Sequence, residues 1–586
     1  MNKKLFILIL IILLGFFLRY FYNGSIPPGL NRDEASIGYT AYSLLKTGRD
    51  EYGRFLPISI ESFGDWKLPL YIYTDILPIQ LFSLNEFSVR FPSLLFGTLT
   101  ILIVYFLTKQ LFEDEKHNET IALATSFLLA ISPWHIHFSR VASEANLAVF
   151  FTSFGLLLFL KGLKASSSLY CSAIIFALTL YTYHGNHIFT ILLFFALLFI
   201  LVKKQLAKKS ILIFLLLFAI IISYILKETL LSADRIKISG LLPLSDRFLI
   251  YEKVVQPRLE HGNPSSIITL FTHNKLVFQI EYFLQGYFRS FSPEFLFIKG
   301  GTNFAHNIPN FGNLYMWEAP FIILGLYFLF QQKKKWRHLL LWWLLISPIP
   351  ASLTRDVPHS ARMLAILPLP HLLASLGLIE IINIARKLPK KTVIILCCSV
   401  FLVINFYLYL DRYFIHFPLE AEFAWGGGYK ELVSEINNLS PNYSEILMDR
   451  PDESPYIYFL FYQKFDPKVY QKEAVRYPID TEGFHHVKSI GNITFKKLNW
   501  SDDLIVPGRL LVSWAESTPP SATRSAVLVD REVLDRIEKE KGTTSLTVGE
   551  DEIVRRIIKV IRLQNGQPQF YLIDIGKVKR ETPIYE

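Results

Sequence analysis

The sequence contains little cysteine and lacks a phosphate-binding loop. Its three cysteines, Cys171, Cys397 and Cys398, all lie within apolar segments. A disulfide framework is therefore not predicted, and we expect these side chains to pack among apolar neighbours. The triple glycine Gly426–Gly428 is not followed by the Gly-Lys-Ser/Thr of a phosphate-binding loop, so it favours a turn at a helix start over a nucleotide site.

Charge is scarce over most of the first 410 residues. Hydrophobic residues make up 51% of the chain and aromatic residues 15%. They occur in blocks of about 16–22 residues between Leu5 and Leu410, as a hydrocarbon layer of about 30 Å requires, and the blocks end after Asp411. This composition excludes a single soluble domain and predicts an integral membrane protein.

The basic residues gather in the short connections between these blocks. The formal net charge is +10, but this distribution follows the positive-inside rule and requires no nucleic-acid partner. The rule orients the chain in a cell membrane, multi-pass, with its N-terminus in the cytoplasm. The basic residues expected on the cytoplasmic side are Lys3, Lys4, Lys109, Lys116, Lys161, Lys164, Lys203, Lys204, Lys208, Lys209, Lys333, Lys334, Lys335, Arg337, Arg386, Lys387, Lys390 and Lys391.

The apolar blocks predict about eleven membrane-spanning helices within a transmembrane domain over residues 1–410. Met1–Tyr22 has a basic start and no small-residue cleavage signal, so we expect a retained signal anchor. Segment 68–83 is short, and we expect it at the membrane interface because a full span would reverse the sidedness of almost all the basic connections. The other spans are expected near 90–108, 120–134, 143–161, 168–184, 187–202, 211–227, 315–331, 338–350, 363–383 and 392–410.

This topology places a first outer loop, residues 23–89, and a second long loop, residues 228–314, outside the membrane. The second loop has helical periodicity around Leu276–Phe291 and is expected to form an ordered cap with amphipathic helices. Segment 351–362 is also outside. Residues 411–586 are expected to form a soluble extracytoplasmic α/β domain.

The α/β prediction for the C-terminal domain rests on several local patterns. Tyr429–Leu439 has a helical pattern, Glu445–Asp449 is typical of a strand, and Pro455–Lys464 is an aromatic helix candidate. Arg509–Trp514 is typical of a further strand, and Asn565-Gly566 indicates a hairpin turn.

The first outer loop carries an acidic pair, Asp33-Glu34, close to the membrane edge. With Asn31 as N-cap, the pair is typical of the start of a helix over Ala35–Leu45. Ionisable groups at a membrane edge are costly and are commonly functional, and a helix start also holds a carboxylate rigidly. We therefore interpret the pair as part of an active site.

Lys67 lies where the same loop returns to apolar sequence. A lysine at such a place commonly extends to the interface without any function. An ammonium at the headgroup level, within one loop of two carboxylates, also suits a lipid phosphate. The residues alone leave both interpretations open.

Arg140 and Glu144 are spaced i,i+4 at the outer entry to the fourth predicted span. They are typical of one helix ion pair, although the cost of charge there favours residues that face a polar cavity. His135 and His137 alternate just before them, but two imidazoles without a carboxylate partner are weak evidence for a metal.

Outer segment 351–362 is rich in cationic side chains. Arg355, His359 and Arg362 lie on the side that the positive-inside rule leaves poor in such charge. An anion-binding site explains this departure best.

These motifs, taken in order, resemble glycosyltransferase family 39 and its relatives, the protein O-mannosyltransferases and lipid A aminoarabinose transferases of the C-type (GT-C) membrane glycosyltransferases. The layout of residues 5–410 is similar. The similarity is sharpest at Asp33–Tyr39, Lys67–Tyr71, Arg90–Gly97 and Ser139–Glu144. The resemblance implies inverting transfer of one sugar from a polyprenyl-phosphate carrier to an acceptor on the outer face, without a nucleotide sugar.

The resemblance also assigns roles to residues. Asp33 matches the family's catalytic acid, Lys67 the lysine near the carrier phosphate, and Arg140 an arginine at the second outer turn; Glu144 stands where relatives often have Asp. Inverting transfer needs a base for the acceptor hydroxyl and a cationic pocket for the leaving phosphate. The expected catalytic residues are Asp33, Glu34 and Glu144, and the expected donor phosphate-binding residues are Lys67, Arg140, His359 and Arg362. We expect no metal or other cofactor, because Lys and Arg side chains can neutralise the leaving group.

Other functions are compatible with the same composition. A transporter or flippase for lipid-linked sugars would place polar residues within spans, whereas here the charges gather at the outer edge and no inverted repeat is evident. An oligosaccharide ligase or polymerase would use the same lipid carrier with a longer donor. A membrane-anchored binding module would not need about eleven spans. The sequence leaves the acceptor open as a protein, a lipid or a glycan.

Overall fold

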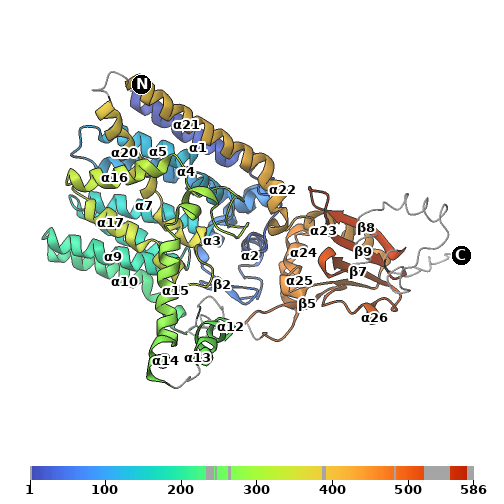
Figure 1. Cartoon of the computed structure of the whole chain (residues 1–586). Coiled ribbons are helices and arrows are strands. Elements are labelled where there is room, and N and C mark those ends of the chain that lie inside the picture. The colour runs from blue at the N-terminus through green and yellow to red at the C-terminus, as the bar shows by residue number, and fades with distance from the viewer. Residues whose placement is uncertain are drawn as a thin grey trace.

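The computed structural model describes residues 3–231, 243, 247–261, 266–385, 391–480, 483–519, 553 and 555–576. A helical bundle forms most of it, and one mixed sheet lies at the end of the molecule away from the N-terminus (Figure 1). The predicted basic residues Arg386, Lys387 and Lys390 lie outside the described residues.

Apolar helices of 4 to 26 residues form the bundle. Most of their side chains are apolar, and a helix pairs its own backbone N–H and C=O groups without water. They are α1 (Lys3–Tyr20), α4 (Glu86–Leu111), α5 (Asn118–Ile131), α6 (Pro133–Ser139), α7 (Glu144–Gly162), α8 (Ser166–Thr179), α9 (Asn186–Lys203), α10 (Lys208–Leu231), α16 (Glu318–Gln331), α17 (Arg337–Ile346), α18 (Ile349–Ser352), α19 (Ser360–Met363), α20 (Leu369–Ala385) and α21 (Lys391–Asp411).

Five of the described helices are long and apolar enough to cross a membrane, and the number rises to seven if each of two bent pairs is one span. This confirms a multi-pass membrane protein but not the predicted number of eleven. Apolar helices occur at all the expected ranges, yet some are short: α8 and α16 have 14 residues each and α17 has 10. At 1.5 Å per residue, 14 residues extend about 21 Å, which is less than the hydrocarbon layer.

Both bent pairs break at a proline. α5 and α6 meet at an angle of 59° beside Pro133, and helix 360–366 meets α20 at 50° beside Pro368. Proline lacks the N–H group that would continue the helix.

α16 and α20 pack in direct backbone contact. A Cβ atom at Gly325 would lie 1.9 Å from the carbonyl oxygen of Leu373, and one at Gly377 would lie 2.2 Å from that of Phe321. Small residues allow this approach, which is a common way of packing helices in membranes.

The first outer loop is an ordered structure and supplies two of the candidate site residues. It contains α2 (Arg32–Thr47), a two-stranded hairpin of β1 (Ile60–Ser62) and β2 (Asp65–Lys67), and α3 (Pro69–Phe82). α3 is the short helix predicted at the interface, and its 14 residues include Pro78.

The second long loop contains α12 (Arg247–Ile250), α13 (Gln256–Glu260), α14 (Ile267–Thr272) and α15 (Lys275–Arg289). α15 confirms the predicted helical periodicity. Its Tyr287 hydroxyl donates to the carbonyl of Leu345 at 2.8 Å, so the helix lies against the end of α17.

The C-terminal unit is a seven-stranded mixed sheet with helices beside it (Figure 1). β3 lies between parallel neighbours β6 and β7, and the strand order is β4-β5-β6-β3-β7-β9-β8. Its elements are α22 (Phe417–Ala421), α23 (Tyr429–Leu439), β3 (Glu445–Met448), α24 (Tyr456–Tyr462), α25 (Pro467–Glu473), β4 (Val475–Arg476), β5 (Val487–Ile490), β6 (Ile493–Phe495), α26 (Trp500–Asp503), β7 (Arg509–Trp514), β8 (Ile557–Arg562) and β9 (Pro568–Asp574). The predicted helices, strands and hairpin are all present.

Candidate functional site

An ion pair in the first outer loop is the centre of the candidate site. Asn31 caps α2 by accepting a hydrogen bond from the backbone N–H of Glu34 at 2.9 Å, which places Asp33 in the first turn. Lys67, the last residue of β2, contacts Asp33 with its Nζ 2.8 Å from Oδ1. The Lys67 side chain is 7% exposed and that of Asp33 is 56% exposed. The Asp33 carboxylate is therefore accessible to solvent, while the Lys67 side chain is buried.

Charge on both partners is favoured by their contact. Burial would raise the pKa of Asp33, but Lys67, with smaller effects from Arg32 and His306, lowers that pKa to about 2. Burial would lower the pKa of Lys67, but Asp33 and then Glu144 raise it. Because the Asp33 carboxylate is exposed, solvent screens part of this attraction.

Glu144 is the second carboxylate beside Lys67. It is the first residue of α7, where Ser143 is the N-cap and accepts from the backbone N–H of Asn146. Its Oε1 is buried and, among the described residues, has no hydrogen-bond partner. Lys67 therefore lies in the electrostatic field of two carboxylates that come from different loops.

Arg140 and Glu144 do not form the helix ion pair that their spacing allowed. α6 ends at Ser139 and α7 begins at Glu144, so the two residues lie on different elements. Arg140 Nη1 donates to the carbonyl of Leu18 at 2.8 Å, and Nη2 to that of Ile26 at 3.0 Å. The guanidinium thus joins the α6–α7 turn to the end of α1.

Glu34, like Arg140, makes structural contacts. It forms a buried ion pair with Arg90, in which Nε donates to Oε1 at 3.0 Å and Nη2 to Oε2 at 2.9 Å. Its Oε1 also accepts from the backbone N–H of Ala142 at 2.7 Å. Glu34 and Arg140 were both predicted in the site, and the structure instead places both in the packing behind it.

The imidazole and guanidinium groups of the site come from loop 303–313 and segment 351–362. The rings of His306 and His359 lie 4.7 Å apart between centroids. Arg362 Nη1 donates to Thr354 Oγ1 at 2.8 Å, and the electrostatic effects of Asp33 and Arg362 both reach His306. Burial, with the charge of Arg362, lowers the pKa of His306 to about 4 against the opposing effect of Asp33.

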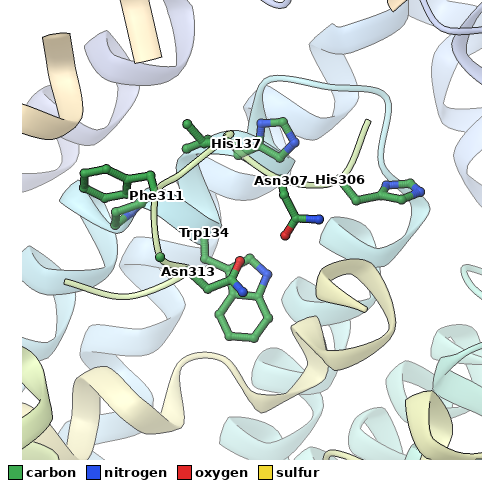
Figure 2. Close-up of a pocket in the computed structure, with 9 residues that line it drawn as sticks. Trp134, His137, His306, Asn307, Phe311 and Asn313 are labelled. Atoms are coloured by element: carbon green, nitrogen blue, oxygen red, sulfur yellow. The ribbon is translucent and has the colours of Figure 1, made fainter. Parts of the chain in front are cut away.

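Loop 303–313 is fixed to α6 and to Ser360. The Ser360 hydroxyl donates to Asn313 Oδ1 at 3.1 Å, and Trp134 Nε1 donates to the Ser360 carbonyl at 3.1 Å. Figure 2 shows His306, Asn307 and Asn313 on this loop beside α6, which carries Trp134 and His137. The cavity between them has a volume of about 10 Å³, which suits one water molecule rather than a sugar.

The two alternating histidines contact different groups. His135 Nδ1 lies 2.7 Å from Arg19 Nη2, whereas the ring of His137 lies among the aromatic rings of Tyr413, Phe417 and Trp425. Within the described part of the chain, no group of three or more His, Cys, Asp or Glu side chains is arranged to hold a metal ion.

Tyr183 is a site residue that sequence reasoning missed. It lies in the outer connection between α8 and α9, and Arg362 and Glu144 are both close enough to influence its hydroxyl. Burial raises the pKa of Tyr183 to about 12, although Arg362 opposes this effect. The polar bend Tyr183–Asn186 between two apolar segments was the available signal.

The structure therefore brings together five of the predicted site residues with two others. The predicted ones are Asp33, Lys67, Glu144, His359 and Arg362, and the added ones are Tyr183 and His306. A carboxylate that is open to solvent lies on one side, and an arginine with two histidines lies on the other. Such an arrangement can accept a proton and stabilise an anion within one site.

Comparisons with known proteins are consistent with this geometry. Residues 67–226 match the family model of dolichyl-phosphate-mannose-protein mannosyltransferase. This range includes Lys67 and Glu144. A comparison with curated protein sequences gives no match.

Among solved structures, the oligosaccharyltransferase of Archaeoglobus fulgidus tethered to an acceptor peptide has 14% identity and a TM-score of 0.50, with 88% of this chain and 70% of that chain covered. The oligosaccharyltransferase AglB from Archaeoglobus fulgidus in complex with an inhibitory peptide and a dolichol-phosphate has 14% identity and a TM-score of 0.49, with 79% of this chain and 64% of that chain covered. ArnT from Cupriavidus metallidurans bound to undecaprenyl phosphate has 11% identity and a TM-score of 0.46, with 97% of each chain covered. The family match and the oligosaccharyltransferase fold confirm the resemblance to C-type membrane glycosyltransferases.

Proposed function

We propose that this protein is a membrane glycosyltransferase that moves a single sugar from a polyprenyl-phosphate carrier to an acceptor on the extracytoplasmic face. The observation that carries the proposal is the contact between Lys67 and an exposed Asp33, opposite Arg362 and its two histidines. The family match supports it because it includes Lys67 and describes enzymes that use a lipid-phosphate sugar.

In the proposed reaction, Asp33 takes the proton of the acceptor hydroxyl. The hydroxyl oxygen forms a bond to the anomeric carbon of the sugar while the bond from that carbon to the phosphate oxygen breaks. The electron pair of the broken bond leaves with the phosphate, which Lys67 and Arg362 stabilise. The new bond forms on the face of the anomeric carbon opposite the bond that breaks, so the reaction inverts the configuration of that carbon.

The donor phosphate would also prepare the base. Lys67 lowers the pKa of Asp33 to about 2, so the carboxylate is a weak base while the two side chains are in contact. A phosphate that binds the Lys67 ammonium competes with Asp33 for that charge, which raises the proton affinity of the carboxylate. Donor binding and base activation would thus be coupled through one lysine.

A second candidate function is supported by the fold. The structure with a TM-score of 0.50 is an oligosaccharyltransferase, so the chain could act as a ligase for a lipid-linked oligosaccharide. Lys67 and Arg362 are cations that either donor could engage through its phosphate. The length of the donor glycan separates the two functions experimentally.

The test is a transfer assay in liposomes with radiolabelled polyprenyl-monophosphate sugars and with a pyrophosphate-linked oligosaccharide, using membrane extract as the acceptor. We expect wild type to transfer label from a monophosphate sugar and the Asp33→Asn variant to transfer none. Glu453→Gln, at an exposed carboxylate of the C-terminal domain, serves as the matched control. Transfer from the oligosaccharide alone would favour the ligase, and equal turnover by Asp33→Asn would contradict the role of Asp33.

A further inference from the structure

The β1–β2 hairpin that presents Lys67 is held from outside by the C-terminal domain. Lys67 pairs with Ile60 in the hairpin register, so its backbone position depends on the hairpin as a whole. The turn of the hairpin is Phe63-Gly64, and both residues have positive φ, 60° and 92°. This conformation is strained for Phe63, and surrounding contacts must maintain it.

Segment 483–486 of the C-terminal domain supplies those contacts. The backbone N–H of His485 donates to the carbonyl of Phe63 at 2.9 Å. A Cβ atom at Gly64 would lie 2.3 Å from the carbonyl oxygen of Gly483, so the two backbones meet directly. The domain thus contacts the hairpin turn through backbone atoms, which a change of side-chain rotamer cannot move apart.

Side chains extend the same contact. His485 Nδ1 lies 3.3 Å from Oε1 of Glu61 in β1, and its ring stacks on Tyr52 at 5.9 Å between centroids. The Phe63 ring packs edge-on against Tyr456 of α24, with centroids 5.9 Å apart. The strained Phe63 is buried by these contacts, with 4% of its surface exposed.

The bundle holds the hairpin from the other side. A hydrogen bond joins the hydroxyls of Ser62 and Ser36 of α2, and the Trp66 carbonyl lies 2.8 Å from His184 Nε2. The hairpin is therefore clamped between the bundle and segment 483–486. Loss of the outer contact would remove the hydrogen bond and the backbone packing that the C-terminal domain supplies at the turn.

We propose that the C-terminal domain is a positioning element of the transfer site, in which segment 483–486 clamps the β1–β2 hairpin and so sets the position of the Lys67 ammonium. The proposal rests on the proposed function, because Lys67 is there the group that binds the donor phosphate. Gly64, Gly483 and His485 are positioning residues that act through Lys67.

The variant that tests the clamp is Gly64→Ala, because its methyl group collides with the Gly483 carbonyl. Gly53→Ala is the matched control: Gly53 lies in the same outer loop with φ of 82°, but nothing lies within 4 Å of its added Cβ. Both substitutions add a Cβ atom at a position with positive φ, but only Gly64→Ala introduces a collision with segment 483–486. We expect Gly64→Ala to lower kcat/KM for the polyprenyl-monophosphate sugar about 100-fold, as a misplacement of about 1 Å does, and Gly53→Ala to stay near wild type.

His485→Ala provides a milder variant in case Gly64→Ala does not fold. It removes the contacts to Glu61 and Tyr52. His486→Ala is its control because the His486 side chain contacts Asp480 of the C-terminal domain and not the hairpin. We expect His485→Ala to weaken binding of undecaprenyl phosphate and His486→Ala to leave it unchanged.

A double-variant cycle separates positioning through Lys67 from a general loss of structure. In the Lys67→Ala background, His485→Ala should have no further effect on donor kcat/KM or on undecaprenyl phosphate binding. Additive losses, or equal losses in His485→Ala and His486→Ala, would overturn the clamp while leaving the transferase intact. A wild-type protein that neither transfers sugar nor binds the carrier would instead overturn the proposed function.

Discussion

Two adjacent carboxylates in the first turn of α2 have opposite environments. Asp33 is 56% exposed and pairs with Lys67, whereas Glu34 is 1% exposed and pairs with Arg90. Successive helix residues point about 100° apart, so neighbours in sequence face different surroundings. Asp33 is available to an acceptor, and Glu34 secures the packing of α2 against α4.

Lys67→Ala tests the phosphate role. A hydrogen bond to a charged group contributes about 1.5–3 kcal/mol, so we expect KM for the polyprenyl-phosphate donor to rise about 10- to 150-fold while KM for the acceptor changes little. Lys430→Ala is the control, because Lys430 also contacts a carboxylate, Glu86, at 2.8 Å but is largely exposed. The measurement is initial-rate kinetics with each substrate varied. An equal change in both KM values would argue against a donor-specific contact.

Glu51 should make stability depend on pH. Burial raises the pKa of this fully buried carboxyl to about 8, despite the opposing charge of Arg476. The folded chain thus retains a proton that the unfolded chain releases above about pH 4.3, so the contribution of Glu51 to stability falls as pH rises from about 4 to 8. Glu51→Gln should therefore become more stable relative to wild type from pH 5 to pH 8, as measured by thermal unfolding in detergent. A difference that does not vary over this range would contradict the assignment.

At the scale of the element, α2 is the support of the candidate base. Its N-cap Asn31 accepts from the Glu34 N–H, and its C-cap Gly48 adopts the left-handed conformation that ends a helix. The first turn therefore has a defined start, and Asp33 faces Lys67 because of it.

Asn31→Ala should cost about 1 kcal/mol of stability and should also lower transfer, because the first turn of α2 would fray around Asp33. Asn274→Ala is the matched control: Asn274 caps α15 in the same way, by accepting from the N–H groups of Leu276 and Val277. Its loss should cost a similar amount in thermal unfolding without lowering transfer as strongly. Equal transfer losses in the two variants would show a general effect of stability.

At the scale of the whole molecule, the polar groups of the site come from segments far apart in the chain. The first outer loop, the α6–α7 turn, the α8–α9 connection, loop 303–313 and segment 351–362 meet at one end of the bundle, beside the C-terminal domain. All of these segments are on the outer side in the topology that the basic residues predict.

This topology can be tested directly. We expect the N-terminus in the cytoplasm and the C-terminal domain outside, because every basic connection then lies inside. A reporter active only outside the cytoplasm should be active when fused after Glu586, and a cytoplasm-only reporter should be inactive there. The same reporters fused in the 203–209 connection provide the opposite control. Activity of the cytoplasm-only reporter at the C-terminus would refute the orientation.

Much of the fold was predictable because its signals are local. α23 occupies Tyr429–Leu439 and β7 occupies Arg509–Trp514, as their patterns predicted. The predicted number of eleven spans is not confirmed. Hydropathy measures composition, whereas helix ends depend on prolines and packing; α17, for example, has 10 residues within a longer apolar block. Asp33 and Lys67 could be selected as candidates from their motif and from their position at the membrane edge.

The sequence by itself determined that the chain is a membrane protein, where its apolar helices lie and which motif carries the acidic pair, because hydropathy, capping and charge distribution are properties of short segments. The tertiary structure alone decided which charges meet. Arg140 and Glu144 lie four residues apart but face different partners, while Lys67 contacts Asp33 across 34 residues. A buried charge takes whichever partner the packing brings near, and that packing is a property of the whole chain.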